Sequence, residues 1–478
     1  MGQRRAYSEL NMSDRVDYYN GISYEPVLSL DGGPPELKAL QAVCKQMIDV
    51  PYCSGTVQLN PSNSLVFYRK GNVSSFIDFA HPTEKRLMAL AGACSPASFG
   101  RNSENILDEK YRRAGQLETK DFSAQFSLHD SGVLKTAVES LLKVEGSVAN
   151  VRAELYKLNV YGPGSFFKAH VDTPRSDTMF ASLVVVLPTP HSGGSLLFRH
   201  RNTEYIFDSA AAVSSSSPKT PYAAFAAFFS DVEHEVTEVT SGHRVSLTYN
   251  LYNTAPVDTK VANISPTSTG VTTWDDSQKV NALKEALTSL LRVPTFLPDG
   301  GLLAFSLAYD YPFKQNSTQL SDIKRHLKST DTLLVRACDE LGLAASLKAL
   351  YWTANVEEFS DVFCFLDDFG DTDINELEEG FFNNLCDRNK GAIVGYDTLA
   401  PQQDIGRYAS DERKPGTRPN SDYFPDGTEI LPVVWATALD SKNAFQKVYI
   451  AYGNEAELDF AYGRVCLVIR VCPAVDRI

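Results

Sequence analysis

The sequence predicts an α+β protein whose central part is a β-sandwich or a double-sheet barrel. Helical patterns dominate the stretch up to residue 149, and short β-rich segments fill residues 150–255. Helical and β-rich segments alternate from residue 281 to the end. Short strands that follow one another closely are typical of sandwiches and barrels. We therefore expect four regions, with bounds at 1–149, 150–255, 256–280 and 281–478.

The first region, 1–149, is predicted to be mainly helical and to support the later sheet. Its clearest segment is "PPELKALQAVCKQMIDV", which places Pro35 where a helix tolerates proline, in the first turn. The apolar side chains then recur near helical spacing at Leu37, Leu40, Val43, Met47 and Ile48. The segments "PTEKRLMALAGACS" and "GVLKTAVESLLKVEG" show the same pattern.

The central region, 150–255, consists of short β-rich segments separated by Gly, Pro, Asp or Ser. They read "AELYKLNVYGPG", "SLVVVLP", "GGSLLFRH", "EYIFDS", "AAFAAFFSD", "HEVTEVTSG" and "HRVSLTYNLY". The polar stretch 256–280 is predicted to be a linker. Beyond it, 281–478 mixes helical segments such as "VNALKEALTSLLRV" with strands such as "GRVCLVIRV". The acidic segment 365–380 lacks the ligand spacing of an EF-hand, so a solvated loop is favoured there over a calcium site.

Composition and charge restrict the classes of function. The chain of 478 residues carries a net charge of −14, which disfavours nucleic acids and anionic membrane surfaces as partners. No apolar run approaches the length needed to span a bilayer, and the N-terminus shows no apolar signal segment. The eight cysteines are scattered without a Cys-x-x-Cys pair. We expect an intracellular soluble protein, cytoplasmic or nuclear, with reduced cysteines and no contact with a membrane.

A candidate metal site begins at "FKAHVDT", residues 167–173. On a β-strand, His170 and Asp172 point to the same face and could bind one ion, although such a pair also arises by chance on a surface. A third ligand is available in His234, which lies between two β-rich segments. Two histidines and one carboxylate form the facial triad of non-haem Fe(II) oxygenases, which leaves coordination positions open for a co-substrate and O2.

A candidate anion site follows ten residues after His234. On a strand, Arg244, Ser246 and Thr248 share one face. A guanidinium beside a hydroxyl is a suitable receptor for a carboxylate, such as the far carboxylate of 2-oxoglutarate.

Together these motifs resemble the Fe(II)- and 2-oxoglutarate-dependent dioxygenases, in particular the prolyl 4-hydroxylase-like branch. The similar pattern is Tyr-x-x-Gly-x-x-Phe-x-x-His-x-Asp, which starts at Tyr161 and ends at Asp172. A distal histidine and a basic residue ten positions later complete it. The resemblance covers residues 150–255 and implies a double-stranded β-helix, or jelly roll, with supporting helices and an additional α+β C-terminal region.

The resemblance also implies roles for individual residues. His170, Asp172 and His234 would bind Fe(II), and Arg244 would bind the far carboxylate of 2-oxoglutarate with help from Ser246. Tyr161 would line the co-substrate pocket or pack as a core aromatic.

The implied reaction hydroxylates an unactivated C–H bond in a protein residue such as proline, or in a small molecule. 2-Oxoglutarate is decarboxylated to succinate and CO2, O2 is consumed, and ascorbate is the expected reductant. The carboxylate of Asp172 favours hydroxylation over halogenation, because related halogenases have a small residue at that position.

Two other readings are open. The chain could be a catalytically inactive binding or scaffold protein on a dioxygenase fold, or a metal oxygenase that does not use 2-oxoglutarate. Arg244 argues against the second reading, and succinate production separates the two enzymes. Region 281–478 exceeds a minimal catalytic domain and has no second His-x-Asp pair, so we expect no second iron site there.

The remaining polar candidates carry weaker expectations. His191 lies in a predicted exposed turn, and His243 is expected to pack or face solvent. His200 is either a solvated strand end or a group at the mouth of the site. Arg175 is an alternative contact for a substrate carboxylate.

Overall fold

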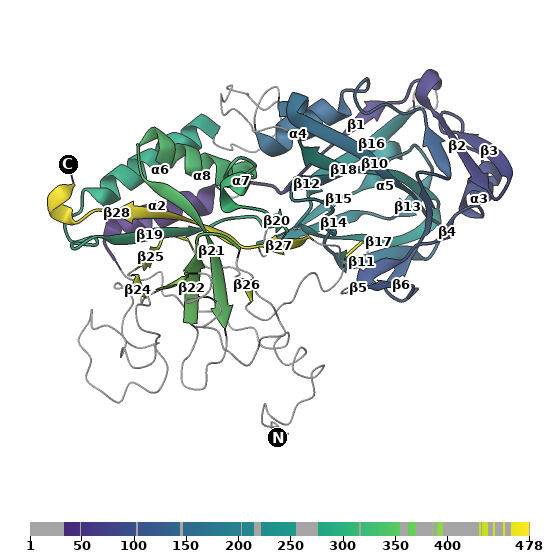
Figure 1. Cartoon of the computed structure of the whole chain (residues 1–478). Helices are drawn as coiled ribbons and strands as arrows, with labels where there is room; N and C mark the ends of the chain where they lie inside the picture. The colour runs from purple at the N-terminus through teal and green to yellow at the C-terminus, as the bar shows by residue number, and fades with distance from the viewer. Residues whose placement is uncertain are drawn as a thin grey trace, which may run out of the picture.

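The computed structural model describes residues 33–477 apart from several gaps. The gaps are 48, 102–103, 144–146, 202, 215–220, 255–275, 315–316, 354–361, 370–384, 386–389, 395–429, 432, 438–442, 445–452 and 455–459. Figure 1 shows two bodies side by side, a jelly-roll body and a C-terminal body. One hydrophobic cluster runs through both bodies, from Leu158 and Phe228 to Leu287 and Ile469. None of the described helices is long and apolar enough to cross a membrane.

The jelly-roll body is built from two sheets. The larger has seven strands in the order β1 (Tyr52–Gln58), β16 (Tyr222–Phe229), β12 (Met179–Val186), β18 (Arg244–Asn253), β10 (Val151–Tyr161), β8 (Gly115–Glu118) and β4 (Ser95–Pro96). The smaller has the order β15 (Thr203–Phe207), β14 (Leu196–His200), β17 (Glu233–Gly242), β11 (Ser165–His170) and β7 (Arg112–Arg113), with β13 (His191–Gly193) also paired to β17.

The two sheets face each other through aromatic side chains. Phe198 of β14 lies 5.0 Å from Phe228 of β16, measured between ring centroids. Along the chain, β10, β11, β12, β14, β16, β17 and β18 fall alternately in the larger and the smaller sheet. This winding is that of a jelly roll, so the expected core fold is confirmed.

The N-terminal region corrects the sequence prediction. Helices are present at α2 (Pro35–Gln46), α3 (Glu84–Ala91) and α4 (Val133–Leu142), where the apolar spacing indicates them. However, the region 52–124 is mostly strands: besides β1, β4, β7 and β8, it contains β2 (Leu65–Lys70), β3 (Val73–Asp78), β5 (Phe99–Arg101), β6 (Glu104–Ile106) and β9 (Phe122–Ala124). In β2 the apolar residues form one run, LVFY, and in β3 they stand at Val73, Phe76 and Ile77, so neither strand shows the alternating pattern of a half-buried strand.

The helices of this region also divide between the two bodies. α4 packs against β1 and β16, which supports the larger sheet as expected. By contrast, α2 packs against α6 (Asp276–Leu291) of the C-terminal body. The prediction that the whole region 1–149 supports the jelly roll is therefore wrong for α2.

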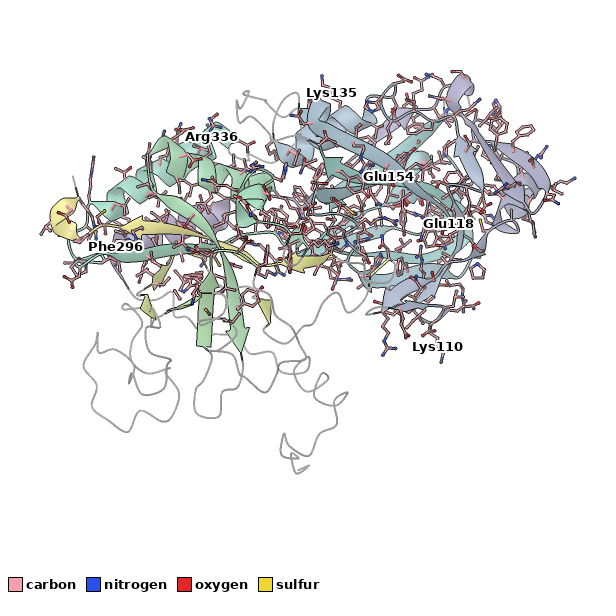
Figure 2. The ribbon with its side chains drawn as sticks, viewed as in Figure 1. Lys110, Glu118, Lys135, Glu154, Phe296 and Arg336 are labelled. Atoms are coloured by element: carbon pink, nitrogen blue, oxygen red, sulfur yellow. The ribbon has the colours of Figure 1, made fainter. Side chains whose placement is uncertain are left out.

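The C-terminal body is an eight-stranded sheet covered by helices. Its strand order is β24 (Ile430–Leu431), β23 (Ala392–Val394), β22 (Val362–Leu366), β21 (Ala345–Thr353), β28 (Val465–Val471), β19 (Gly301–Ser306) and β25 (Val433–Trp435), with β26 (Asn443–Ala444) paired to β21. In Figure 1, α2, α6 and α8 (Ser329–Glu340) lie together over one face of this sheet. Figure 2 places Phe296, which is fully buried, in this body.

The remaining elements are short. They are β20 (Tyr311–Phe313), which pairs with β27 (Ala461–Gly463), the helices α5 (Ser209–Ser214) and α7 (Leu320–Lys324), and the 3-10 helices Pro61–Asn63, Ser147–Asn150 and Ala474–Asp476. Most of the predicted linker 256–280 lies outside the described residues, and its last part, from Asp276, belongs to α6. The acidic segment 365–380 is described only up to residue 369, so the loop prediction lies largely outside the described residues.

Candidate functional site

Two histidines meet across a pair of strands in the smaller sheet. His170 is the last residue of β11 and pairs in register with His234 of β17. Both side chains are buried, and burial lowers the pKa of His170 well below its ordinary value, which keeps this imidazole neutral. Nδ1 of His170 lies 2.8 Å from the carbonyl of Lys168, and Nδ1 of His234 lies 2.9 Å from the carbonyl of Val232. Because a carbonyl only accepts, each Nδ1 carries the proton and each Nε2 keeps a free lone pair.

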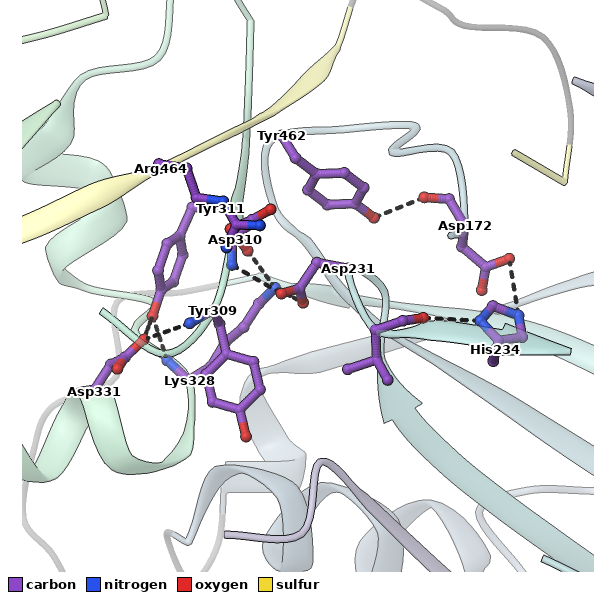
Figure 3. Close-up of polar contacts among 11 residues, drawn as sticks. Asp172, Asp231, His234, Tyr309, Asp310, Tyr311, Lys328, Asp331, Tyr462 and Arg464 are labelled. Atoms are coloured by element: carbon purple, nitrogen blue, oxygen red, sulfur yellow. Dashed lines mark hydrogen bonds and ion pairs between the residues drawn. The ribbon is translucent and has the colours of Figure 1, made fainter. Parts of the chain in front are cut away.

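Asp172 completes the cluster from just beyond the strand. The sequence predicts Asp172 on the same strand as His170, but β11 ends at His170 and Asp172 lies two residues beyond it. Its carboxylate nevertheless turns to the histidines, and Oδ1 lies 3.8 Å from Nε2 of His234 (Figure 3). Ser182 of β12 donates a short hydrogen bond to Oδ2. One ligand atom from each of His170, Asp172 and His234 lies within 4.8 Å of the others, which is the geometry that a single metal ion can bridge.

Arg244 lies at the start of β18, directly opposite Tyr161 of β10. Its side chain is only 1% exposed, and burial lowers its pKa from 12.5 to about 10. Nε donates to Ser209 at 3.3 Å and Nη1 donates to Ser246 at 3.4 Å. Among the described residues, Nη2 has no hydrogen-bond partner and no carboxylate forms an ion pair with this guanidinium.

An unpaired buried cation of this kind is costly, because transfer out of water removes its hydration and nothing replaces it. An anionic ligand would restore the missing partner. Arg244 lines the same pocket as His170, Asp172 and His234, so a carboxylate bound to the guanidinium would lie in the pocket that also contains the triad. The donor set and the orphaned guanidinium therefore fit a metal ion and a dicarboxylate together.

Aromatic and small residues shape the pocket around these groups. Phe167 stacks on the His170 ring at 3.5 Å between centroids, and Phe228 lies 4.5 Å from the His234 ring. Tyr161 is buried and lines the pocket, with its ring 5.4 Å from the Arg244 guanidinium. Of the two readings for Tyr161, the structure places it in the pocket wall, where it also packs in the core.

Residues that the sequence motifs did not single out also surround the Arg244 side chain. Ser209, at the start of α5, accepts from Arg244, and its Oγ lies 3.3 Å from Nε2 of His191. His191 is buried rather than in an exposed turn, so that expectation is wrong. Gly194 has φ of +70°, and a Cβ there would lie 2.8 Å from Cδ of Arg244. The glycine pair in "HSGGS" is a visible signal for such a close approach, whereas nothing in the sequence marks Ser209.

The other polar candidates lie away from the triad. His200 stacks on Tyr309 of the C-terminal body at 4.8 Å, and burial lowers its pKa to about 4. It is therefore a contact between the two bodies rather than a solvated strand end. The Arg175 guanidinium lies over the Tyr156 ring at 4.9 Å, and Nδ1 of His243 lies 3.6 Å from the carboxylate of Glu84.

Residues 156–252 match the family model described as the 2OG-Fe(II) oxygenase superfamily. This segment is similar to the 2OG-Fe(II) oxygenase superfamily. The matched segment contains every residue of the triad and Arg244. The match supports, at the level of the superfamily, the resemblance that the sequence motifs indicate.

Comparisons with solved structures return members of the same group at low similarity. A prolyl-4-hydroxylase from Pseudomonas putida is 17% identical and has a TM-score of 0.27, with coverage of 45% of this chain and 99% of that one. A prolyl hydroxylase from Trichoplax adhaerens, solved with a hypoxia inducible factor peptide fragment, is 16% identical with a TM-score of 0.26 and coverage of 46% and 91%. A viral collagen prolyl hydroxylase from Paramecium Bursaria Chlorella virus-1, solved with 2OG, is 16% identical with a TM-score of 0.22 and coverage of 37% and 94%. A search of curated proteins found no match.

Proposed function

We propose that this protein is an Fe(II)- and 2-oxoglutarate-dependent hydroxylase of the prolyl 4-hydroxylase-like type. One observation carries the proposal: the buried His-Asp-His cluster and the unpaired cation of Arg244 line a single pocket. The superfamily match supports it independently. The substrate class is a protein residue such as proline, or a small molecule, and the products from 2-oxoglutarate are succinate and CO2.

His170, Asp172 and His234 would hold the iron through two neutral imidazoles and one carboxylate. Bound Fe(II), with 2-oxoglutarate and O2, supplies the oxidising power needed to convert a C–H bond to an alcohol, and ascorbate is the proposed reductant. The carbonyls of Lys168 and Val232 fix the proton of each imidazole on Nδ1, so Nε2 is always ready to bind metal.

Arg244 would anchor the far carboxylate of 2-oxoglutarate, with Ser246 at one side of the guanidinium and Tyr161 beneath it. The guanidinium already donates to Ser209 and Ser246, which leaves Nη2 oriented by its neighbours and free for the ligand. The triad, which lines the same pocket, would be available to the keto acid end. Phe167, Phe228 and Leu196 line the same pocket and would exclude water from the reacting groups.

The proposal is tested by release of labelled succinate from labelled 2-oxoglutarate in the presence of Fe(II) and ascorbate. Wild-type protein should produce succinate even without a prime substrate, because such enzymes commonly turn over 2-oxoglutarate slowly when uncoupled. His170→Ala should produce none.

Binding measurements separate the alternatives if no succinate appears. Failure of the wild type to bind both Fe(II) and 2-oxoglutarate would favour the scaffold reading. Metal binding without 2-oxoglutarate binding would favour a metal oxygenase that uses no 2-oxoglutarate.

A substitution at Gly194 should weaken the co-substrate site without touching the metal ligands. In Gly194→Ala, the new Cβ would lie 2.8 Å from Cδ of Arg244 and 2.9 Å from Cγ2 of Val239, so both side chains must shift, and the guanidinium of Arg244 moves with its side chain. We expect the KM for 2-oxoglutarate to rise about 10-fold, equivalent to about 1.4 kcal/mol of lost binding. The measurement is succinate formation against 2-oxoglutarate concentration.

Gly132→Ala is the matched control for this variant. Gly132 has a φ of +74°, close to the +70° of Gly194, but no atom lies within 4 Å of the position of its Cβ. It therefore reports the backbone strain alone, about 1 kcal/mol of stability, with no change in KM. Equal KM values for the two variants would contradict the proposed role of Gly194.

A further inference from the structure

Two residues of the C-terminal region contact Asp172 of the candidate metal site. Asp172 makes four polar contacts, which involve its amide, its carbonyl and both carboxylate oxygens. Ser182 and the carbonyl of Ser230 provide two of them from the jelly-roll body. The other two come from Asn454 and Tyr462, which lie almost 300 residues further along the chain.

Asn454 holds the carboxylate by a two-point contact. Its Nδ2 donates to Oδ1 of Asp172 at 2.6 Å, and its Oδ1 accepts from the amide of Thr173 at 3.1 Å. The amide group therefore spans the ligand and the residue after it. Because both ends of the side-chain amide are used, Asn454 lies in a defined orientation rather than as a free side chain.

The backbone beside Asn454 is anchored to the jelly-roll body as well. Gly453 and Gly100 exchange two backbone hydrogen bonds, at 2.9 and 3.0 Å. Gly453 also forms a parallel bridge with Val171, the residue between the two ligands of the His-x-Asp motif. The short stretch 453–454 thus continues the sheet edge next to the metal site.

Tyr462 fixes the backbone of the same ligand. Its hydroxyl donates to the carbonyl of Asp172 at 2.8 Å, as Figure 3 shows. Tyr462 belongs to β27, which pairs with β20 at Pro312.

These contacts decide which carboxylate oxygen faces the histidines. Ser182 occupies Oδ2, while Oδ1 lies toward His234 and accepts from Asn454. Without Asn454, the carboxylate could rotate about its terminal bond, and metal binding would have to restrict that rotation. Hydrogen bonds of this kind to a ligating carboxylate orient it and tune its affinity for the metal.

We propose that the C-terminal body completes the metal site, with Asn454 and Tyr462 as positioning residues for Asp172. This inference rests on the proposed function of the triad as a metal site. It gives region 281–478 a specific role: the jelly roll carries the three ligands, and the second body sets the orientation of the carboxylate.

The test uses the full-length chain, with Co(II) as the probe for the metal site. Affinity and the visible absorption spectrum of bound Co(II) are measured for wild type, Asn454→Ala and Tyr462→Phe. Loss of such a supporting contact typically weakens metal binding by about 10- to 100-fold, so we expect a loss in this range for Asn454→Ala and a smaller loss for Tyr462→Phe. Both variants should also shift the Co(II) spectrum, which a purely structural role would leave unchanged.

Tyr309→Phe is the matched control. Tyr309 is a buried tyrosine at the contact between the same two bodies, and its ring stacks on His200, but it makes no hydrogen bond to Asp172. It should leave Co(II) affinity and spectrum unchanged. Thermal unfolding without metal checks that each variant is folded, and Tyr462→Phe, which removes a single oxygen atom, decides the question if Asn454→Ala does not fold.

The outcomes separate this inference from the proposed function. If wild type binds Co(II) and both variants bind it with the same affinity and spectrum, the positioning role is overturned while the metal site stands. If wild type binds no Co(II), the proposed function itself fails, and the inference fails with it.

Discussion

Replacing Arg244 with methionine is expected to weaken 2-oxoglutarate binding strongly and, at the same time, to stabilise the unliganded protein. The guanidinium is 1% exposed, and one of its nitrogens has no partner among the described residues. Loss of one member of a buried charge pair costs about 2–5 kcal/mol of binding, so the Kd should rise at least ~30-fold. Methionine has a similar length and no charge to desolvate, so the free energy of unfolding should increase by about 1 kcal/mol or more.

Isothermal titration with 2-oxoglutarate and thermal unfolding of the unliganded protein measure the two effects. Arg199→Met is the control, because Arg199 lies in β14 of the same body but forms ion pairs with Glu204 and Glu235 at the surface. It should change neither quantity beyond the few tenths of a kcal/mol typical of exposed pairs. A marked loss of stability in Arg244→Met would show that the cation has a partner in the unliganded protein and would contradict the prediction.

Replacing Lys328 with methionine is expected to have the largest effect on stability. The side chain is buried between the two bodies, and Nζ donates to the carboxylate of Asp231 at 2.6 Å and to the carbonyl of Asp310 at 2.7 Å (Figure 3). Removing one partner of a buried ion pair leaves an uncompensated charge and typically costs about 3–5 kcal/mol. Chemical denaturation of wild type and variant measures this difference.

The same substitution should also weaken the metal site. Asp231 directly precedes Val232, whose carbonyl holds Nδ1 of His234. The backbone that orients this imidazole is thus adjacent to the carboxylate that Lys328 neutralises. We expect a lower affinity for Co(II) in Lys328→Met, in addition to the loss of stability.

Two further variants define the origin of the effect. Lys284→Met removes a lysine from an exposed pair with Glu340, where the expected cost is below about 1 kcal/mol. The double variant Lys328→Met with Asp231→Asn removes both charges and should recover part of the lost stability. A cost for Lys328→Met no larger than that for Lys284→Met would contradict the importance of the buried pair.

Much of the candidate site follows from local spacing. The pattern around His170 and Asp172, and the ten residues between His234 and Arg244, indicate the candidate ligands before any fold is known. The strands that carry them are marked by dense β-branched and aromatic residues, which predict a sandwich or a double-sheet barrel, and the family resemblance narrows this fold to a jelly roll. The structure adds the register, in which His170 lies opposite His234 and Tyr161 lies opposite Arg244.

The strands of residues 52–124 were not predictable in the same way. β2 and β3 expose half of their side chains, and only Val66, Tyr68 and Ile77 of these two paired strands are buried. Apolar periodicity therefore gives little indication of such strands. The packing of α2 against α6 was not predictable either, because the sequence of an amphipathic helix does not indicate which surface its apolar face contacts.

The amino-acid sequence by itself determined the resemblance to a known superfamily, the β-rich segments of the central region and the set of candidate ligands, because these depend on residues close together in the chain. Only the tertiary structure decided that Asn454 and Tyr462 reach Asp172, that Ser209 and Gly194 shape the space around Arg244, and that Lys328 is buried against Asp231. These contacts join segments far apart in sequence. They arise from how the two bodies pack, and packing of distant surfaces leaves no periodic or spaced pattern in the sequence.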